Sequence, residues 1–81
     1  SYLARGNSKS RQEDHRAALQ DYNQAIELAP DDPQAYYNRG LSRTKLNNYR
    51  AALQDFTKTI ELSPDNVQAY YSRGMCKLKL D

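Results

Sequence analysis

Apolar residues recur at spacings of one, three and four positions in this chain of 81 residues. In residues 49–62 these positions are Ala52, Leu53, Phe56 and Ile60. Such spacings place side chains on one face of an α-helix and leave polar residues on the other. The pattern predicts an amphipathic helix over 49–62. The segment between Asp14 and Pro30 carries the same pattern and predicts a second such helix.

Capping residues and prolines mark the helix boundaries. Asp32 can accept hydrogen bonds from free amide groups and Pro33 suits a first helical turn, so a helix is predicted to begin here. The pair Asn47 and Asn48 indicates a turn, with Asn48 as the candidate cap of the next helix. Pro64 ends that helix, because proline disfavours helical conformation at the residue before it.

The remaining segments also predict helices. Residues 34–46 and 68–80 contain helix-forming residues and few breakers, so each is predicted to form one helix. Asp14 is the predicted cap of the helix that ends before Pro30, and a further helix is expected before Asp14. The sequence therefore predicts an all-α fold of five helices.

The chain repeats itself with a period of 34 residues. Residues 1–32 and 35–66 share 15 identities in 32 aligned positions, which is far more than chance. The period predicts repeats at about 1–32, 33–66 and 67–81, the last of them partial, in one domain spanning 1–81. Each repeat is predicted to be a pair of antiparallel helices.

Each repeat places a glycine within a predicted helix, at Gly6, Gly40 and Gly74. A glycine inside a helix costs about 1 kcal/mol relative to alanine, so three copies at one register indicate a packing requirement. The absent side chain lets the partner helix approach closely. Ala18 and Ala52 are small residues positioned to do the same from the second helix.

The repeated positions resemble the tetratricopeptide repeat. The pattern is an aromatic residue, Gly four later, Ala twelve after Gly, an aromatic four later, Ala three later and Pro five later. The two repeats match eleven of its twelve positions with Tyr2, Gly6, Ala18, Tyr22, Ala25 and Pro30, and with Tyr36, Gly40, Ala52, Phe56 and Pro64. Thr59 is the exception, and the partial repeat supplies Tyr70 and Gly74. The resemblance covers essentially the whole chain and implies a right-handed α-solenoid of antiparallel helix pairs.

An arginine precedes the repeated glycine where the family usually has leucine. An unpaired buried charge is costly, so each such arginine needs a partner. In an antiparallel pair, Arg5 lies level with Asp21 and Arg39 with Asp55, so both ion pairs are predicted. The alternative is that the arginine heads reach solvent over their apolar stems.

In the family, the first helix of each repeat lines a concave groove that binds peptides or partner helices. The resemblance implies groove positions at Leu3, Ala4, Asn7, Ser10, Arg11, Gln34, Tyr37, Asn38, Leu41, Thr44, Lys45, Gln68, Tyr71, Ser72, Met75, Leu78 and Lys79. It implies packing positions at Tyr2, Gly6, Ala18, Tyr36, Gly40, Ala52, Phe56, Tyr70 and Gly74. Tyr37 and Tyr71 are then groove contacts; the alternative is that they only pack against neighbouring repeats.

Co-chaperones of this family clamp a terminal carboxylate with two Lys, one Arg and two Asn. Here Asn7 and Asn38 fill the asparagine positions, but Leu3, Gln68 and Ser72 stand at the other three. Without those cations a carboxylate loses its charge-assisted partners, so the clamp is incomplete. The apolar and polar groove edged by Lys45 and Lys79 favours a peptide with some acidic character.

Composition argues against other functions. The net charge of +2 is too small to indicate nucleic-acid binding, and no apolar run is long enough for membrane insertion. His15 and Cys76 stand alone, without the orienting partners that catalysis needs, so no enzyme is expected. No ligand spacing indicates a metal site, and no cofactor is expected. A single cysteine mildly favours a reducing, cytoplasmic location.

Two functional hypotheses follow. The first is a non-catalytic scaffold that binds a peptide or partner segment in the groove. The second is a self-association module, a homo-oligomer through its terminal helices, because the last helix carries Tyr71, Met75, Leu78 and Leu80 with no following helix to cover them. Either the natural chain continues beyond Asp81 or these residues meet another copy.

Overall fold

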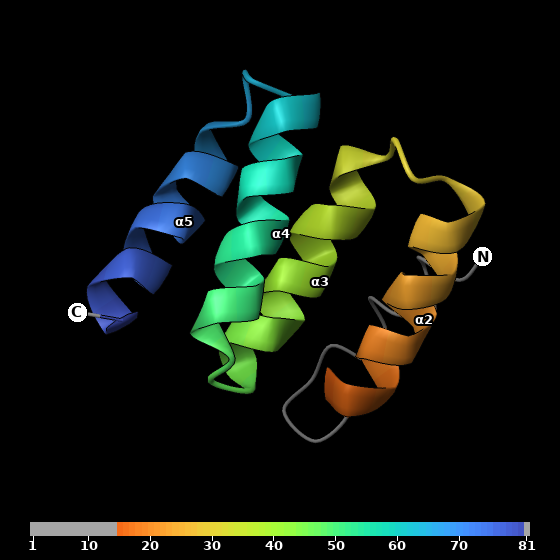
Figure 1. Cartoon of the computed structure of the whole chain (residues 1–81), viewed down its shortest axis with the longest axis horizontal. Helices are drawn as coiled ribbons and strands as arrows, with labels where there is room; N and C mark the ends of the chain where they lie inside the picture. The colour runs from red at the N-terminus through yellow and green to blue at the C-terminus, as the bar shows by residue number, and fades with distance from the viewer. Residues whose placement is uncertain (1–14, 81) are drawn as a thin grey trace.

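A computed structural model of the chain describes residues 15–80. In this range the protein consists of the helices α2 (His15–Leu28), α3 (Pro33–Lys45), α4 (Tyr49–Leu62) and α5 (Val67–Leu80). Consecutive helices contact each other and run in opposite directions, from α2 at one edge to α5 at the other (Figure 1). The predicted all-α fold is confirmed. The count of five helices is not supported, because four helices fall within 15–80 and the expected first helix lies outside the described residues.

The start of α3 follows the predicted capping chemistry. Asp32 has an extended backbone, and its Oδ1 accepts a hydrogen bond of 3.0 Å from the amide of Gln34. Pro33 is the first helical residue, where its missing N–H group has no bond to lose. The predicted helix start at Asp32 and Pro33 is confirmed.

The turn between α3 and α4 forms at the predicted asparagines. Asn47 has a φ of 64°, in the left-handed region that asparagine tolerates better than most residues. Its amide donates to the carbonyl of Thr44 at 3.0 Å, and the amide of Asn48 donates to that of Arg43 at 2.8 Å. These two bonds satisfy free carbonyl groups at the end of α3. Asn48 occupies the predicted N-cap position of α4, but its side chain makes no capping hydrogen bond.

α5 begins after Asn66, a capping residue that the sequence pattern did not predict. The side-chain Oδ1 of Asn66 accepts a hydrogen bond of 3.0 Å from the amide of Ala69. The helix starts at Val67, one residue before the predicted boundary at Gln68. Asparagine is among the preferred N-cap residues, so the residue type at position 66 could have indicated the start of α5.

The packed interior of the described residues is built from small residues and the large aromatic side chains Tyr22 and Phe56. Between α3, α4 and α5, the buried residues Ala52, Phe56 and Cys76 form a core cluster, and the half-buried Tyr37, Tyr49 and Leu53 pack against it. In α2, Ala18 and Tyr22 are buried in the same way. Alanines on one helix face let the neighbouring helix approach, so the aromatic rings fill the remaining space.

Candidate partner-binding surface

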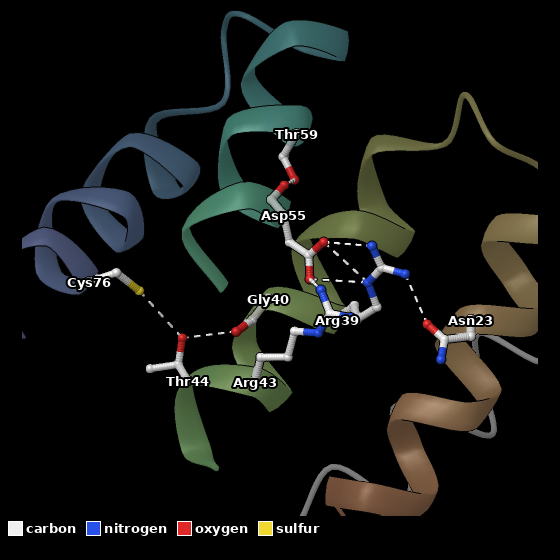
Figure 2. A network of polar contacts seen from close by, with 8 residues as sticks. All are labelled: Asn23, Arg39, Gly40, Arg43, Thr44, Asp55, Thr59 and Cys76. Carbon is white, nitrogen blue, oxygen red and sulfur yellow. Dashed lines mark hydrogen bonds and ion pairs between the residues drawn. The ribbon is translucent and has the colours of Figure 1, made fainter. Parts of the chain in front are cut away.

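A buried carboxylate joins α4 to α3. Arg39 Nη2 lies 2.7 Å from Asp55 Oδ1, and Arg39 Nε donates to both oxygens at 3.2 and 3.1 Å (Figure 2). The predicted ion pair between Arg39 and Asp55 is therefore confirmed. The corresponding pair between Arg5 and Asp21 lies partly outside the described residues.

A second arginine shares this carboxylate. Arg43 Nη1 donates to Asp55 Oδ2 at 2.9 Å, from one turn further along α3 (Figure 2). The Asp55 side chain is only 3% exposed, whereas those of Arg39 and Arg43 are 17% and 23% exposed. Both carboxylate oxygens are thus satisfied inside the protein while the cations keep some contact with water. This arrangement limits the desolvation cost that a buried ion pair carries.

Arg39 also reaches the preceding helix. Its Nη1 donates to Asn23 Oδ1 of α2 at 2.9 Å, so one guanidinium group links α2, α3 and α4 (Figure 2). Its centre lies 5.6 Å from the centre of the Tyr36 ring, within the range of a cation–π contact. The repeat pattern did not predict the roles of Asn23 and Arg43. Arg43 could have been found, because residues four apart in a helix lie on the same face.

Gly40 lies directly against the ring of Phe56. A Cβ atom added at Gly40 would lie 2.7 Å from Phe56 Cε1, closer than real side chains approach. The close approach expected at Gly40 is present, and the atoms that occupy the space belong to the ring of Phe56. Thr59, at the position where the family usually has alanine, is fully buried. Its hydroxyl donates to the carbonyl of Asp55 at 2.8 Å and so remains satisfied within α4.

The two adjacent tyrosines of α3 are both half-buried. The ring of Tyr37 lies 5.7 Å from that of Phe56 at an interplanar angle of 55°, which is a favourable tilted arrangement. Tyr36 lies beneath the guanidinium group of Arg39. Tyr37, expected to contact a ligand, thus also packs against Phe56 of its own repeat, whereas the alternative interpretation expected packing against neighbouring repeats.

The expected groove positions on α3 differ in exposure. Gln34, Leu41 and Lys45 are exposed and follow one face of the helix at spacings of seven and four residues. Asn38 lies between them and is only 6% exposed. Its Oδ1 accepts a hydrogen bond of 3.2 Å from Gln34 Nε2, and its buried Nδ2 has no hydrogen-bond partner among residues 15–80. Asn7 lies outside the described residues.

The expected groove positions on α5 are mostly open to solvent. Tyr71 is 70% exposed and Leu78 is 68% exposed, Met75 and Gln68 are also exposed, and Ser72 is half-buried. α3 and α5 also contact each other, since Thr44 Oγ1 and Cys76 Sγ are 3.6 Å apart (Figure 2). A strip of exposed apolar and aromatic side chains runs along α5, and Leu41 is an exposed apolar side chain of α3.

A separate hollow of about 270 Å³ lies along α4 and is lined by Leu53, Gln54, Thr57, Lys58 and Glu61. None of these residues was expected to contact a partner. The hollow is open, and it provides a surface distinct from the strip on α3 and α5.

Groups that could support chemistry are isolated in the part of the chain that the structure describes. His15 is buried, and its Nδ1 has no hydrogen-bond partner within that part. Cys76 is a buried free thiol that contacts the hydroxyl of Thr44. Between residues 15 and 80, no three His, Cys, Asp or Glu side chains lie close enough to hold a metal ion. None of the helices described here has both the length and the apolar character to span a membrane.

The helix pairs and their period agree with a family model. The model for the tetratricopeptide repeat matches residues 6–77. The chain belongs to the tetratricopeptide repeat family. Members of this family mediate protein–protein interactions and generally act as non-catalytic scaffolds. A search of curated proteins found no match to this tetratricopeptide repeat chain.

Proposed function

We propose that this chain is a non-catalytic scaffold that binds a peptide or partner segment along the strip of exposed side chains on α3 and α5. The observation that carries the proposal is the exposure of Leu41, Tyr71, Met75 and Leu78, which are large apolar or aromatic side chains on the first helices of two successive repeats. Exposed aromatic and methionine side chains are enriched at protein interfaces.

Polar groups beside this strip support the same function. Gln34 is exposed and its Nε2 donates to Asn38 Oδ1 at 3.2 Å, so its amide is positioned to bond the backbone of a bound peptide. Lys45 and Lys79 lie near the carboxyl ends of α3 and α5 and are exposed. They would attract acidic side chains at one edge of the groove, so we infer a peptide that carries acidic residues toward one end.

The proposal includes the organisation of the chain. We infer one domain over residues 1–81, with repeats at about 1–32, 33–66 and 67–81, in which the helix pairs stack into a right-handed solenoid. The contacts of each helix with the next in chain order support this stacking, because repeats of a solenoid contact only their neighbours. The groove would then lie on the concave side of the stack.

Peptide selection tests this function and requires no candidate partner. The folded chain is used to select binders from a displayed library of random 12-residue peptides, and a selected peptide is titrated into isotopically labelled protein. We expect the largest amide shifts at Leu41, Tyr71, Met75 and Leu78. Shifts confined to Leu53 and Lys58, or the absence of any selected binder, would contradict the proposal.

Self-association is the second candidate. It is favoured by Tyr70, Tyr71, Met75, Leu78 and Leu80, which leave α5 with a larger exposed apolar surface than any other described helix. Light scattering over a hundredfold range of protein concentration separates the two functions. A mass that rises with concentration supports self-association, whereas a constant monomer mass excludes it and leaves the scaffold proposal intact.

A further inference from the structure

The exposed charged residues in the described range collect at opposite ends of the helices. The start of α2, the turn between α3 and α4 and the end of α5 lie at one end of the molecule (Figure 1). The turns between α2 and α3 and between α4 and α5 lie at the other end (Figure 1). Exposed basic and acidic residues alternate in groups along the chain. Because the chain reverses direction with each helix, each reversal returns the same sign of charge to the same end.

One end carries only basic residues among its described exposed charges. Arg16 and Arg50 are the second residues of α2 and α4, and Lys45 is the last residue of α3. The last turn of α5 adds two lysines, and no ion pair within residues 15–80 involves any of these side chains. The acidic residues 13, 14 and 81 adjoin this end in the sequence and lie outside the described residues. We name the following set the basic edge: Arg16, Lys45, Arg50, Lys77 and Lys79.

The other end carries only acidic residues among its described exposed charges. Glu27 and Glu61 each stand one residue before the end of their helix, α2 or α4. Asp31 and Asp65 lie in the turns that follow these helices. The half-buried Lys58, one turn before Glu61, lies 3.9 Å from it. We name Glu27, Asp31, Glu61 and Asp65 the acidic edge.

The stability of the single helices does not explain this distribution. The amino end of a helix favours acidic residues and the carboxyl end favours basic residues, because the helix carries a dipole. In α2 and α4 the first turn has an arginine, Arg16 or Arg50, and no acidic residue. The last turn has Glu27 or Glu61 and no basic residue. Each of these charges is unfavourable for its own helix, which indicates a role in contact with another molecule.

The two edges match each other in spacing as well as in sign. Arg16 and Arg50 are 34 residues apart, and so are Glu27 and Glu61. Because each pair recurs once per repeat, its two charges are separated by the same step of the helix stack. A basic edge and an acidic edge can therefore meet at two successive repeats, whereas two edges of the same sign repel each other.

We propose that the basic edge of one copy of this chain binds the acidic edge of a second copy. Each copy has one edge of each sign, at opposite ends, so the copies associate head to tail into an open row. The molecule measures 33 Å along an edge and 16 Å across it between Cα atoms. A contact that covers part of this edge is smaller than the roughly 800 Å² per partner of a standard interface, so it is weak and depends on concentration.

This contact differs from both functions proposed above. Apart from Lys45 and Lys79, it uses none of the side chains proposed to bind a peptide. It also differs from self-association through the exposed apolar residues of α5, because it depends on charge. Contacts between exposed charges weaken as salt screens them, whereas contacts between apolar side chains do not.

Sedimentation of the full chain over a range of protein concentrations tests the proposal. The screening length is about 30 Å at an ionic strength of about 0.01 M and about 3 Å at about 1 M. At low ionic strength we expect the average mass to rise with concentration beyond that of a dimer. At high ionic strength we expect the mass of the monomer.

Two double variants make the test specific. Arg16→Glu with Arg50→Glu removes the basic edge, and Glu27→Lys with Glu61→Lys removes the acidic edge. Each substitution introduces the charge that its helix end favours, so both variants should unfold at urea concentrations no lower than the wild type. Each variant alone should associate at least about tenfold more weakly than the wild type at low salt. An equimolar mixture should form a complex that stops at two copies, because each variant keeps one intact edge.

A charge change away from the edges is the matched control. Gln20 and Gln54 are exposed, stand 34 residues apart and lie within α2 and α4. Gln20→Glu with Gln54→Glu should leave the association of the chain unchanged, because both edges stay intact.

Three results would overturn the proposal. The first is a wild-type mass at low salt that stays that of a monomer, or stops at that of a dimer, up to millimolar protein concentration. The second is equal association of the wild type and both double variants. The third is a mixture in which the two variants remain monomers although the wild type associates. None of these results alters the peptide test of the scaffold function, because the four substituted residues lie outside the strip on α3 and α5.

Discussion

The backbone of Gly40 lies so close to the ring of Phe56 that a methyl group there would approach Cε1 to 2.7 Å. Phe56 is fully buried, so its ring has little room to move away. The close contact between α3 and α4 therefore requires glycine at position 40. The same residue type on α5, Gly74, meets no such contact among the described residues.

Substitution of the two glycines by alanine should have opposite effects on stability. Gly40→Ala overpacks the interior and should lower the free energy of unfolding by about 1–3 kcal/mol. Gly74→Ala should raise it by up to about 1 kcal/mol, because alanine favours the helix more than glycine does. Urea unfolding followed by circular dichroism measures both. Equal changes in the two variants would contradict the role assigned to the Gly40 contact.

The two arginines that share Asp55 should contribute unequally to stability. Asp55→Ala leaves two cations beside a buried position and should cost about 3 kcal/mol or more. Double-mutant cycles should give a larger coupling for Arg39 with Asp55 than for Arg43 with Asp55, because Arg39 makes three of the four contacts. Asp65→Ala, at an exposed position, is the control and should change stability by less than about 0.5 kcal/mol.

The capping residues offer a matched comparison. Asp32→Ala and Asn66→Ala each remove a side-chain bond to a helix amide and should cost about 1 kcal/mol each. Asn48→Ala removes no such bond, so it should cost clearly less. Thermal and urea unfolding of the three variants provide the measurement. A cost for Asn48→Ala equal to that of Asp32→Ala would show that the described cap geometry is wrong.

Substitutions of Tyr37 on α3 and Tyr71 on α5 should distinguish a packing role from a binding role. Tyr37→Ala removes a ring that contacts Phe56 and should lower the free energy of unfolding by about 2 kcal/mol or more. Tyr71 is largely exposed, so Tyr71→Ala should change it by less than about 0.5 kcal/mol. Unfolding curves of the two single variants provide the test. A large loss of stability in Tyr71→Ala would remove Tyr71 from the proposed binding strip.

Much of the fold was predictable because local chemistry and the 34-residue period agree. The period places Arg39 level with Asp55 across an antiparallel pair, and the structure confirms the bond between them. α4 has the predicted bounds 49–62, because an apolar stripe and a following proline define them together. These features depend on spacing alone, which a sequence displays directly.

Other features depend on backbone angles and on the meeting of three helices. Asn48 stands at the N-cap position of α4 without a side-chain capping bond, and its ψ of 70° differs from the ψ of 106° at Asp32, whose side chain does cap α3. Tyr37 contacts Phe56 although the pattern placed it toward a ligand, because a large ring on α3 reaches both α4 and the exposed side. The repeat pattern assigns each position one role, either packing or partner contact. Tyr37 packs against Phe56 and is also half-exposed, so one role does not describe it.

The affinity of a selected peptide for wild type and Tyr71→Ala tests the proposed scaffold function most directly. The peptide comes from the random library, and calorimetry gives its Kd for both proteins, with Gln54→Ala on α4 as the matched control. The account predicts at least about tenfold weaker binding to Tyr71→Ala, since truncation of a central aromatic contact typically costs about 2 kcal/mol or more. Unchanged affinity in Tyr71→Ala together with weaker binding in Gln54→Ala would contradict it.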